Sequence, residues 1–166
     1  GLYMLVAQAV RASEIFLNTK YSDEDTERVY KKVLSDKENI VLCGMPGSGK
    51  SVSGEIASEI FKREVLDIDA LIEEKAGITI PQIFQQYGED YFRKLETECA
   101  VEVGKKTGKI ISCGGGIIKC NENLYHLAQN GKIILIKRNL EDLAKEGRPL
   151  SKDMAALKKM ERERTP

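Results

Sequence analysis

Residues 44–51 read Gly44-Met45-Pro46-Gly47-Ser48-Gly49-Lys50-Ser51, a complete G-x-x-x-x-G-K-[ST] phosphate-binding loop. In front of it, the largely apolar run 39–43 is predicted to be the buried strand that such a loop follows. The glycines allow backbone conformations that a Cβ forbids, so that successive N–H groups converge on phosphate oxygens. The sequence therefore predicts a nucleoside triphosphate site; the alternative is a glycine-rich turn before a helix.

Two residues of the loop add chemistry to that of the backbone. Lys50 brings a positive charge to the phosphates, and Ser51 opens the following helix, where its hydroxyl is placed to reach a magnesium ion. The residues expected to bind the nucleotide are Gly47, Ser48, Gly49, Lys50, Ser51 and Val52.

The composition is that of a globular protein with one domain, or with one domain and a fragment of another. Of 166 residues, 42% are apolar and 31% charged, and the 26 basic and 26 acidic residues cancel. This balance gives no reason to expect a nucleic-acid or acidic-membrane partner. Apolar runs are shorter than a membrane span, and Gln8 and Arg11 interrupt the opening stretch, unlike a secretion signal. We expect a cytoplasmic protein that acts on small molecules.

The cysteines do not form a recognisable metal or disulfide pattern. The four cysteines show no C-x-x-C spacing, and the single histidine, His126, does not complete a zinc set. They are interpreted as reduced thiols. Cys113 precedes a glycine run and is interpreted as a small buried residue, with a position near a ligand as the alternative.

The apolar spacing predicts alternating helices and strands after a helical N-terminus. Residues 2–17 have mostly helical spacing, 18–25 are polar, and a short helix over 25–34 precedes a turn at 35–38. After the loop, Val52, Ile56, Ala57 and Ile60 mark one helix face. Further helices are expected at 70–75, 81–86, 89–106 and 121–129, and strands at 64–67, 110–112 and 132–137. The alternation predicts an α/β fold with a parallel sheet, helices on both faces, and ligands at the carboxyl ends of the strands.

Two carboxylates follow the second expected strand. Asp67 and Asp69 flank Ile68, and in an extended chain residues two apart point to the same side, so both are expected to face the phosphate loop. One is suited to hold magnesium-bound water while the other accepts a proton from a substrate hydroxyl, as phosphoryl transfer requires. The alternative is that Asp69 caps a helix beginning at Ala70.

Over residues 38–166 the chain resembles shikimate kinase. Besides the loop, the motifs are the run 67–84 that starts Asp67-Ile68-Asp69, then Tyr87–Glu96, Ser112–Gly116 and Gly147–Leu150, all in family order. The resemblance implies a P-loop NTPase-like three-layer fold, similar to that of nucleoside-monophosphate kinases. It also implies phosphorylation of the 3-hydroxyl of shikimate, with ATP and Mg²⁺ as cofactors.

The resemblance assigns catalytic and metal roles. It implies that Asp67 supports the metal together with Ser51, and that Asp69 contacts the shikimate hydroxyls and acts as the base. Arg148 matches a lid arginine that closes over the phosphates and neutralises charge during transfer, beside the positive charge of Lys50.

The resemblance also assigns the substrate contacts. Arg93 and Arg164 match the two arginines that bind the shikimate carboxylate, for which the guanidinium fork is suited. Glu96, one helical turn after Arg93, is placed to hold it. The triplet Gly114, Gly115 and Gly116 matches the glycines that approach the substrate ring.

The C-terminal part departs from the family pattern. The lid segment 141–148 is short, and Lys145 stands near the position where many relatives carry an arginine that stacks on adenine, so we expect weaker nucleotide binding. The sequence given stops at Pro166, where the family pattern continues to a fifth strand and a final helix. We therefore expect a kinase domain truncated at its C-terminus, with one sheet edge left unpaired.

The first residues carry a second resemblance. Residues 1–12 are similar to the closing helix of shikimate dehydrogenase, which suggests a fused dehydrogenase–kinase with residues 19–37 as the linker. The division is then 1–36 for the extension and 37–166 for the kinase domain, and an unrelated amphipathic extension is the alternative. We expect a monomeric kinase domain, with the apolar stripe of the first helix packed on the kinase core or on a second chain.

Two other functions remain open from the sequence. Another small-metabolite kinase, such as a gluconate kinase, shares the loop but has no need of two carboxylate-directed arginines beside a glycine triplet. A non-catalytic nucleotide-binding remnant is suggested by the expected truncation.

Overall fold

A computed structural model of the chain describes residues 1–138. It contains two compact units, Gly1–Glu38 and a second unit that begins at Asn39. Among the described residues, no helix combines the length and the apolar character needed to cross a bilayer.

The first unit is a pair of helices, α1 (Leu2–Leu17) and α2 (Asp23–Lys37). Asn18 ends α1 in the left-handed conformation. Ser22 and Asp25 form a capping box at the start of α2, with the Asp25 N–H donating to the Ser22 hydroxyl at 3.1 Å. The ring centroids of Tyr3 and Tyr30 lie 5.3 Å apart, so the two helices touch.

The stretch 19–37, interpreted as a linker, contains α2, which extends the short helix expected over 25–34 at both ends. The expected turn at 35–38 is wrong, since the helix continues through Lys37. The capping box and ion pairs within α2, such as that between Lys32 and Asp36 at 3.0 Å, stabilise a helix in a polar sequence.

The second unit is built on a parallel sheet of four strands, β1 (Asn39–Gly44), β2 (Val65–Asp67), β3 (Ile110–Ser112) and β4 (Gly131–Ile136). The strand order is β2-β3-β1-β4, and Leu42 of β1 lies opposite Ser112 and Ile134. The carboxyl ends of the strands therefore meet at one edge, which brings the segments after β1, β2 and β3 together.

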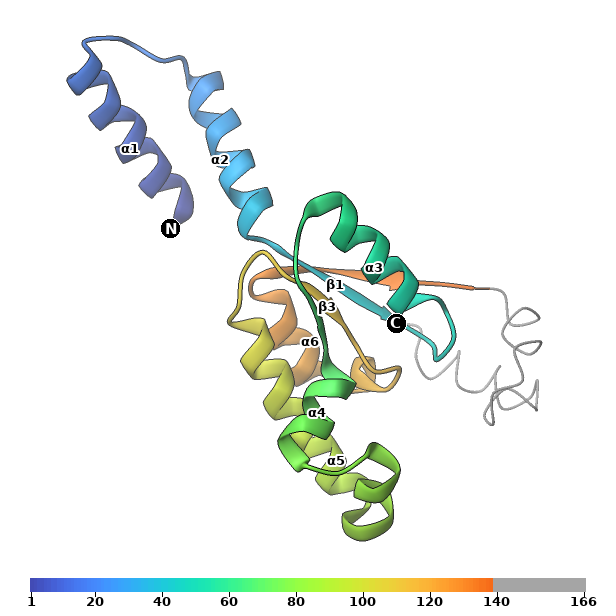
Figure 1. Cartoon of the computed structure of the whole chain (residues 1–166). Helices are drawn as coiled ribbons and strands as arrows, with labels where there is room; N and C mark the ends of the chain where they lie inside the picture. The colour runs from blue at the N-terminus through green and yellow to red at the C-terminus, as the bar shows by residue number, and fades with distance from the viewer. Residues whose placement is uncertain (139–166) are drawn as a thin grey trace. The chain divides into compact units, whose positions relative to one another are not determined.

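Helices cover both faces of this sheet, which confirms the three-layer α/β prediction (Figure 1). On one face lies α3 (Lys50–Phe61); on the other lie α4 (Ile68–Ala76), α5 (Ile80–Gly104) and α6 (Asn121–Ala128), with the short turn η1 (Ile117–Lys119). The two helices expected at 81–86 and 89–106 are confirmed: α5 consists of two helical segments that meet at a kink at Gly88, whose φ of 81° and ψ of 177° are not helical.

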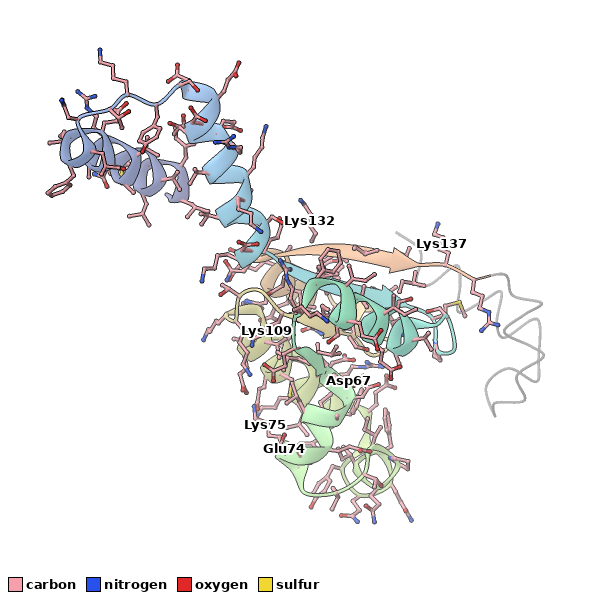
Figure 2. The ribbon with its side chains drawn as sticks, turned by 45° about the horizontal axis from the view of Figure 1, so that its top comes forward. Asp67, Glu74, Lys75, Lys109, Lys132 and Lys137 are labelled. Atoms are coloured by element: carbon pink, nitrogen blue, oxygen red, sulfur yellow. The ribbon has the colours of Figure 1, made fainter. Side chains whose placement is uncertain are left out.

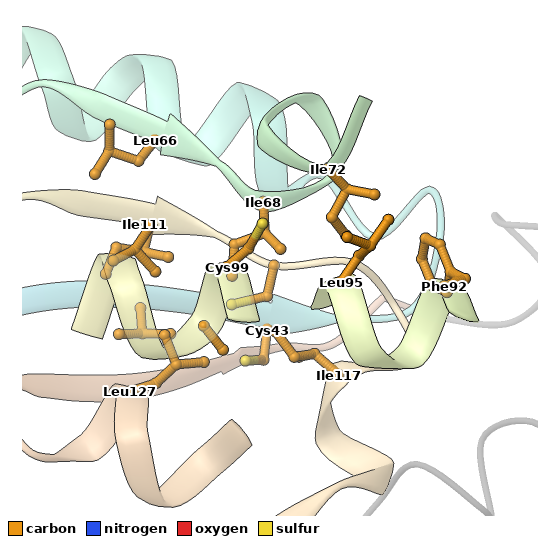
Figure 3. Packing of buried hydrophobic residues seen from close by; sticks show 14 of the residues in the cluster. Cys43, Leu66, Ile68, Ile72, Phe92, Leu95, Cys99, Ile111, Ile117 and Leu127 are labelled. Carbon is orange, nitrogen blue, oxygen red and sulfur yellow. The ribbon is translucent and has the colours of Figure 1, made fainter. Parts of the chain in front are cut away.

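The main core lies between the sheet and α4, α5 and α6 (Figure 3). Strand alternation points Val41, Cys43 and Ile111 into this core, whereas Leu42 and Ile110 point to the opposite face. There a Cβ on Gly54 of α3 would lie 3.6 Å from Leu42, so a glycine lets the helix approach the sheet.

The apolar side chains that mark one face of α3 are not buried within the described part of the chain. Val52 and Ile60 are 60% and 67% exposed, and Ile56 is exposed as well. Gly54, rather than this apolar face, is the closest approach of α3 to the sheet.

A buried amide fixes the start of β1. Asn39 is fully buried, its side chain donates to the Lys106 carbonyl oxygen at 2.7 Å, and the Lys109 N–H donates to its side-chain oxygen at 2.8 Å. Both polar groups of Asn39 are thus satisfied, and the loop between α5 and β3 is tied to the central strand.

Candidate active site

The phosphate loop joins β1 to α3 through backbone conformations that favour glycine. The φ values of Gly44, Gly47 and Gly49 are 156°, 82° and 97°. A Cβ on Gly44 would also lie 2.5 Å from the Ile136 carbonyl oxygen. Gly49 is the N-cap of α3, so the amide groups of the first helical turn face the space above the loop.

The side chain of Lys50 is held over the loop by hydrogen bonds to the backbone of the loop. Its Nζ donates to the carbonyl oxygens of Gly44 at 3.0 Å and Met45 at 2.9 Å. Burial lowers the pKa of Lys50, and the nearby carboxylate of Asp69 opposes that shift. The result is a partly desolvated positive charge in a defined position.

A cavity of about 390 Å³ opens above the loop, at the carboxyl edge of the sheet. This volume is within the range of small-molecule sites. Four segments form its wall: the loop with the start of α3, the end of β2 with the start of α4, the end of β3 with the segment after it, and the segment after β4. The lining residues are Pro46, Gly47, Gly49, Lys50, Ser51, Val52, Asp67, Asp69, Ser112, Cys113, Gly114, Gly115 and Arg138.

Asp67 reaches this cavity as the N-cap of α4 (Figure 2). Its Oδ1 accepts hydrogen bonds from the N–H groups of Asp69 at 2.9 Å and Ala70 at 3.2 Å. The extended-chain reason for expecting both aspartates on one side is wrong, because the helix begins at Ile68. The alternative that Asp69 is the cap is also wrong, since Asp67 has that place.

The surroundings of Asp69 change its acidity. Burial raises its pKa to about 6, with further contributions from the negative charges of Asp67 and Glu96, while Lys50 opposes the shift. A carboxylate with a pKa near 6 in a cavity is suited to accept a proton at neutral pH.

The glycine triplet lies against two predicted substrate-binding side chains. A Cβ on Gly114 would be 2.6 Å from Oδ1 of Asp69, and a Cβ on Gly116 would be 2.6 Å from a guanidinium nitrogen of Arg93. A side chain at either position would displace the end of one of these two side chains, so glycine lets Asp69 and Arg93 keep the positions they have.

Arg93 is oriented by two carboxylates of its own helix. It donates to Glu96 at 2.8 Å and to Glu89 at 3.0 Å, and its guanidinium lies 5.1 Å from the centre of the Phe92 ring. Burial opposes its charge, but the hydrogen bonds to Glu96 and Glu89 more than offset this and raise its pKa. The prediction that Glu96 holds Arg93 is confirmed, and the Glu96 side chain is 1% exposed.

The described residues bring most of the predicted site together, but not all of it. Gly47, Gly49, Lys50, Ser51, Val52, Asp67, Asp69, Gly114 and Gly115 line one cavity. Ser48 is buried, and its hydroxyl has no partner in the described part of the chain. Arg93 and Gly116 contact each other next to the lining residues. Lys145, Arg148 and Arg164 lie outside residues 1–138.

Two neighbours of the site were missed in the sequence. Arg138 lines the cavity and donates to the Gly47 carbonyl oxygen at 3.3 Å. It is the second of two basic residues that directly follow β4, which is a usable signal at the carboxyl edge of a parallel sheet. Cys43 contacts Cys113 from the adjacent strand, and only the strand register reveals this.

Sequence comparisons with known proteins agree on one family. A family model described as shikimate kinase matches residues 46–166. A shikimate kinase of Clostridium botulinum strain 657 is 47% identical over 108 residues, which are 65% of this chain and 64% of that protein. One of strain Loch Maree is 43% identical over 123 residues, 70% of this chain and 72% of that protein. The chain thus spans slightly less than two thirds of the first of these relatives.

Solved structures show the same fold. A shikimate kinase from Acinetobacter baumannii in complex with shikimate has a TM-score of 0.68 and 32% identity, over 80% of this chain and 76% of that one. A gluconokinase from Sinorhizobium meliloti, 17% identical with a TM-score of 0.51 over 78% of this chain and 75% of that one, shares the fold alone. The loop, the aspartate pair, the glycine triplet and the family match over most of the sequence lead to one conclusion: this chain belongs to the shikimate kinase family.

Proposed function

We propose that this chain transfers the γ-phosphoryl group of ATP to the 3-hydroxyl of shikimate, a step in the synthesis of chorismate and the aromatic amino acids. The observation that carries the proposal is that one cavity, with a volume of about 390 Å³, is lined by the phosphate loop, by Lys50 and by Asp69. A phosphate-binding surface and a carboxylate of raised pKa at the same edge of the sheet are the two parts that phosphoryl transfer to a hydroxyl requires.

The nucleotide phosphates bind to the loop amides and to Lys50. Magnesium fits the donors present, because Ser51 and Asp67 both line the cavity and supply oxygen ligands. Magnesium usually takes its remaining ligands from phosphates and water. Bound there, magnesium neutralises charge that develops on the phosphates.

Asp69 accepts the proton of the attacking hydroxyl. Its pKa of about 6 leaves it mostly ionised at neutral pH and still basic enough to take a proton. Gly114 lies beside this carboxylate, and a side chain at Gly114 would meet it. The absence of a side chain leaves space for the substrate ring next to Asp69.

Arg93 binds the substrate carboxylate. Glu96 and Glu89 hold its guanidinium in one orientation, which prepares the fork for a second, planar partner. By family position we further assign Arg164 to the same carboxylate and Arg148 to the phosphates, as the lid arginine.

The substrate assignment is tested by ADP release with ATP and magnesium, in three reactions: with shikimate, with gluconate and without acceptor. We expect turnover with shikimate alone. Turnover with gluconate would make the chain a different metabolite kinase, and nucleotide binding without turnover in any reaction would make it a non-catalytic remnant.

We infer in addition that residues 1–36 are the tail of a dehydrogenase domain fused to a kinase domain that starts at residue 37. The support is the resemblance of residues 1–12 to a dehydrogenase helix and the apolar surface of α1, where Met4 and Phe16 are 62% and 87% exposed. Without that domain, this surface favours self-association, whereas the kinase part is monomeric. An open reading frame that continues upstream into a dehydrogenase would support the fusion, and a start codon directly before residue 1 would contradict it.

A cytoplasmic location agrees with the cysteines. All four are free thiols, as expected in a reducing compartment. Detection of the protein in the cytosolic fraction of its cell tests this location, and its appearance in a secreted fraction would overturn it.

A further inference from the structure

Two cysteines meet at the base of the candidate active site. Leu42 and Ser112 are paired across β1 and β3, so Cys43 and Cys113 are the next neighbours along the two strands. The Cys113 N–H donates to the Leu42 carbonyl oxygen at 3.0 Å, which continues the ladder to this point. Both side chains belong to the same core cluster, and their thiols are hydrogen-bonded to each other (Figure 3 labels Cys43).

The strand geometry suits a disulfide between these two residues. Adjacent strands lie about 4.7–4.9 Å apart, and disulfides join residues whose Cα atoms are about 4.4–6.8 Å apart. Cys99 lies in α5 and Cys120 precedes α6, so neither of them faces another cysteine across paired strands.

Access and reactivity come from the cavity. Cys113 lines the cavity, so the substrate space is the route by which a small peroxide would reach the pair; Cys113 is 2% exposed and Cys43 is fully buried. The hydrogen bond from Cys113 lowers the pKa of Cys43; burial opposes this, and the positive charge of Lys50 adds to the lowering. The same hydrogen bond and burial raise the pKa of Cys113.

We propose that Cys43 and Cys113 are a peroxide-reactive dithiol that closes to an intrachain disulfide. One thiolate attacks a peroxide oxygen, the O–O bond breaks, and a sulfenic acid and hydroxide form. The hydroxide takes the proton of the second thiol to give water. The second thiolate attacks the sulfenic sulfur, the S–S bond forms, and the S–O bond breaks to release hydroxide. Two electrons pass from the sulfurs to hydrogen peroxide, the oxidant.

The disulfide is expected to change the position of Asp69 in the candidate active site. Gly114 follows Cys113 directly and packs against Asp69, so a shift of Cys113 toward β1 moves the backbone that positions this carboxylate. Misplacement of a catalytic group by about 1 Å costs on the order of 100-fold in rate, and we expect at least about a tenfold loss. This consequence rests on the proposed kinase function, whereas the disulfide itself does not.

The test is disulfide mapping of the full chain after treatment with stoichiometric hydrogen peroxide under native conditions. Remaining thiols are alkylated in denaturant, and the peptides are analysed by mass spectrometry. We expect a cross-linked Cys43–Cys113 peptide in the unmodified chain and in the control Cys120→Ser, and none in Cys43→Ala or Cys113→Ala. Either alanine variant suffices if the other fails to fold.

Alkylation of both Cys43 and Cys113 after peroxide treatment, or oxidation of each to a sulfinic acid without a cross-link, would overturn the dithiol. ADP release is then measured before and after reduction by dithiothreitol. Recovery of at least about tenfold on reduction supports the link to the active site, and full activity of the cross-linked chain would overturn it.

Discussion

The two compact units use their apolar residues in opposite ways. In Gly1–Glu38, Val6 is the one buried hydrophobic side chain, and Met4, Leu5 and Phe16 of α1 are exposed. In the second unit, the sheet and the helices α4 to α6 enclose a continuous core. The first unit therefore depends on local capping and ion pairs, whereas tertiary packing holds the second unit and the site it carries.

The largest effect that separates the units is expected at the phosphate loop. Lys50→Ala removes a positive charge that the backbone holds over the cavity, so we expect kcat to fall about 1,000-fold. The exposed Lys62→Ala, at the end of α3, is the control and should retain activity. Steady-state ADP release measures both, and a loss below tenfold in Lys50→Ala would remove the loop from the mechanism.

A matched pair of core and surface truncations tests the packing difference directly. Ile111→Ala empties a fully buried position in β3 and should lower the free energy of unfolding by about 2–5 kcal/mol. Leu5→Ala, on the exposed surface of α1, should change the unfolding of the second unit by less than about 0.5 kcal/mol. Chemical denaturation gives both values. Equal losses would mean that the two units share one core.

The raised pKa of Asp69 predicts how the free energy of unfolding changes with pH. Its folded pKa of about 6 lies above its ordinary value of 3.8, so between these pH values the folded state holds a proton that the unfolded state has released. Stability is therefore lost as pH rises through this window, by at most about 3 kcal/mol. Asp69→Asn removes this dependence, and its stability relative to the unmodified chain should increase from pH 4 to pH 7.

Denaturation in metal-free buffer at several pH values measures this difference. The Asp69→Asn chain should also be inactive, so that stability and activity change in opposite directions. A difference in stability that does not vary with pH would show that the pKa of Asp69 is not raised in the folded chain.

The smallest of these effects concerns substrate specificity. Arg93→Lys keeps a positive charge beside Glu96 but loses the planar fork, so we expect KM for shikimate to rise about 10- to 100-fold while KM for ATP stays within about twofold. Lys94→Arg, the reverse change at the next residue of α5, is the control. Equal increases in both KM values would assign Arg93 to general folding rather than to the substrate.

The sequence predicted those parts of the fold and site that depend on local pattern. The apolar run before Gly44, the loop glycines and the triplet after Cys113 each carry a signal of their own. The structure confirms the strands expected at 39–43 and 110–112, and the first of them continues to Gly44. The start of α4 was not predicted correctly from the sequence. Asp67, not Asp69, is the N-cap of this helix, so the two aspartates do not belong to one extended segment.

Long-range packing was the part that the sequence did not reveal. The contact between Cys43 and Cys113 depends on strand register, and the packing of Gly116 against Arg93 depends on how α5 crosses the segment after β3. Such features follow from the assembled sheet.

The central claim is that the unit beginning at Asn39 carries the whole site, and the most direct test compares ADP release by residues 39–166 with that by residues 1–166. The reactions contain ATP and magnesium, with or without shikimate. We predict shikimate-dependent turnover by both chains, with kcat and KM within about twofold of each other, because the cavity is formed by the second unit alone. Turnover that requires residues 1–38, or that proceeds equally without shikimate, would contradict the claim.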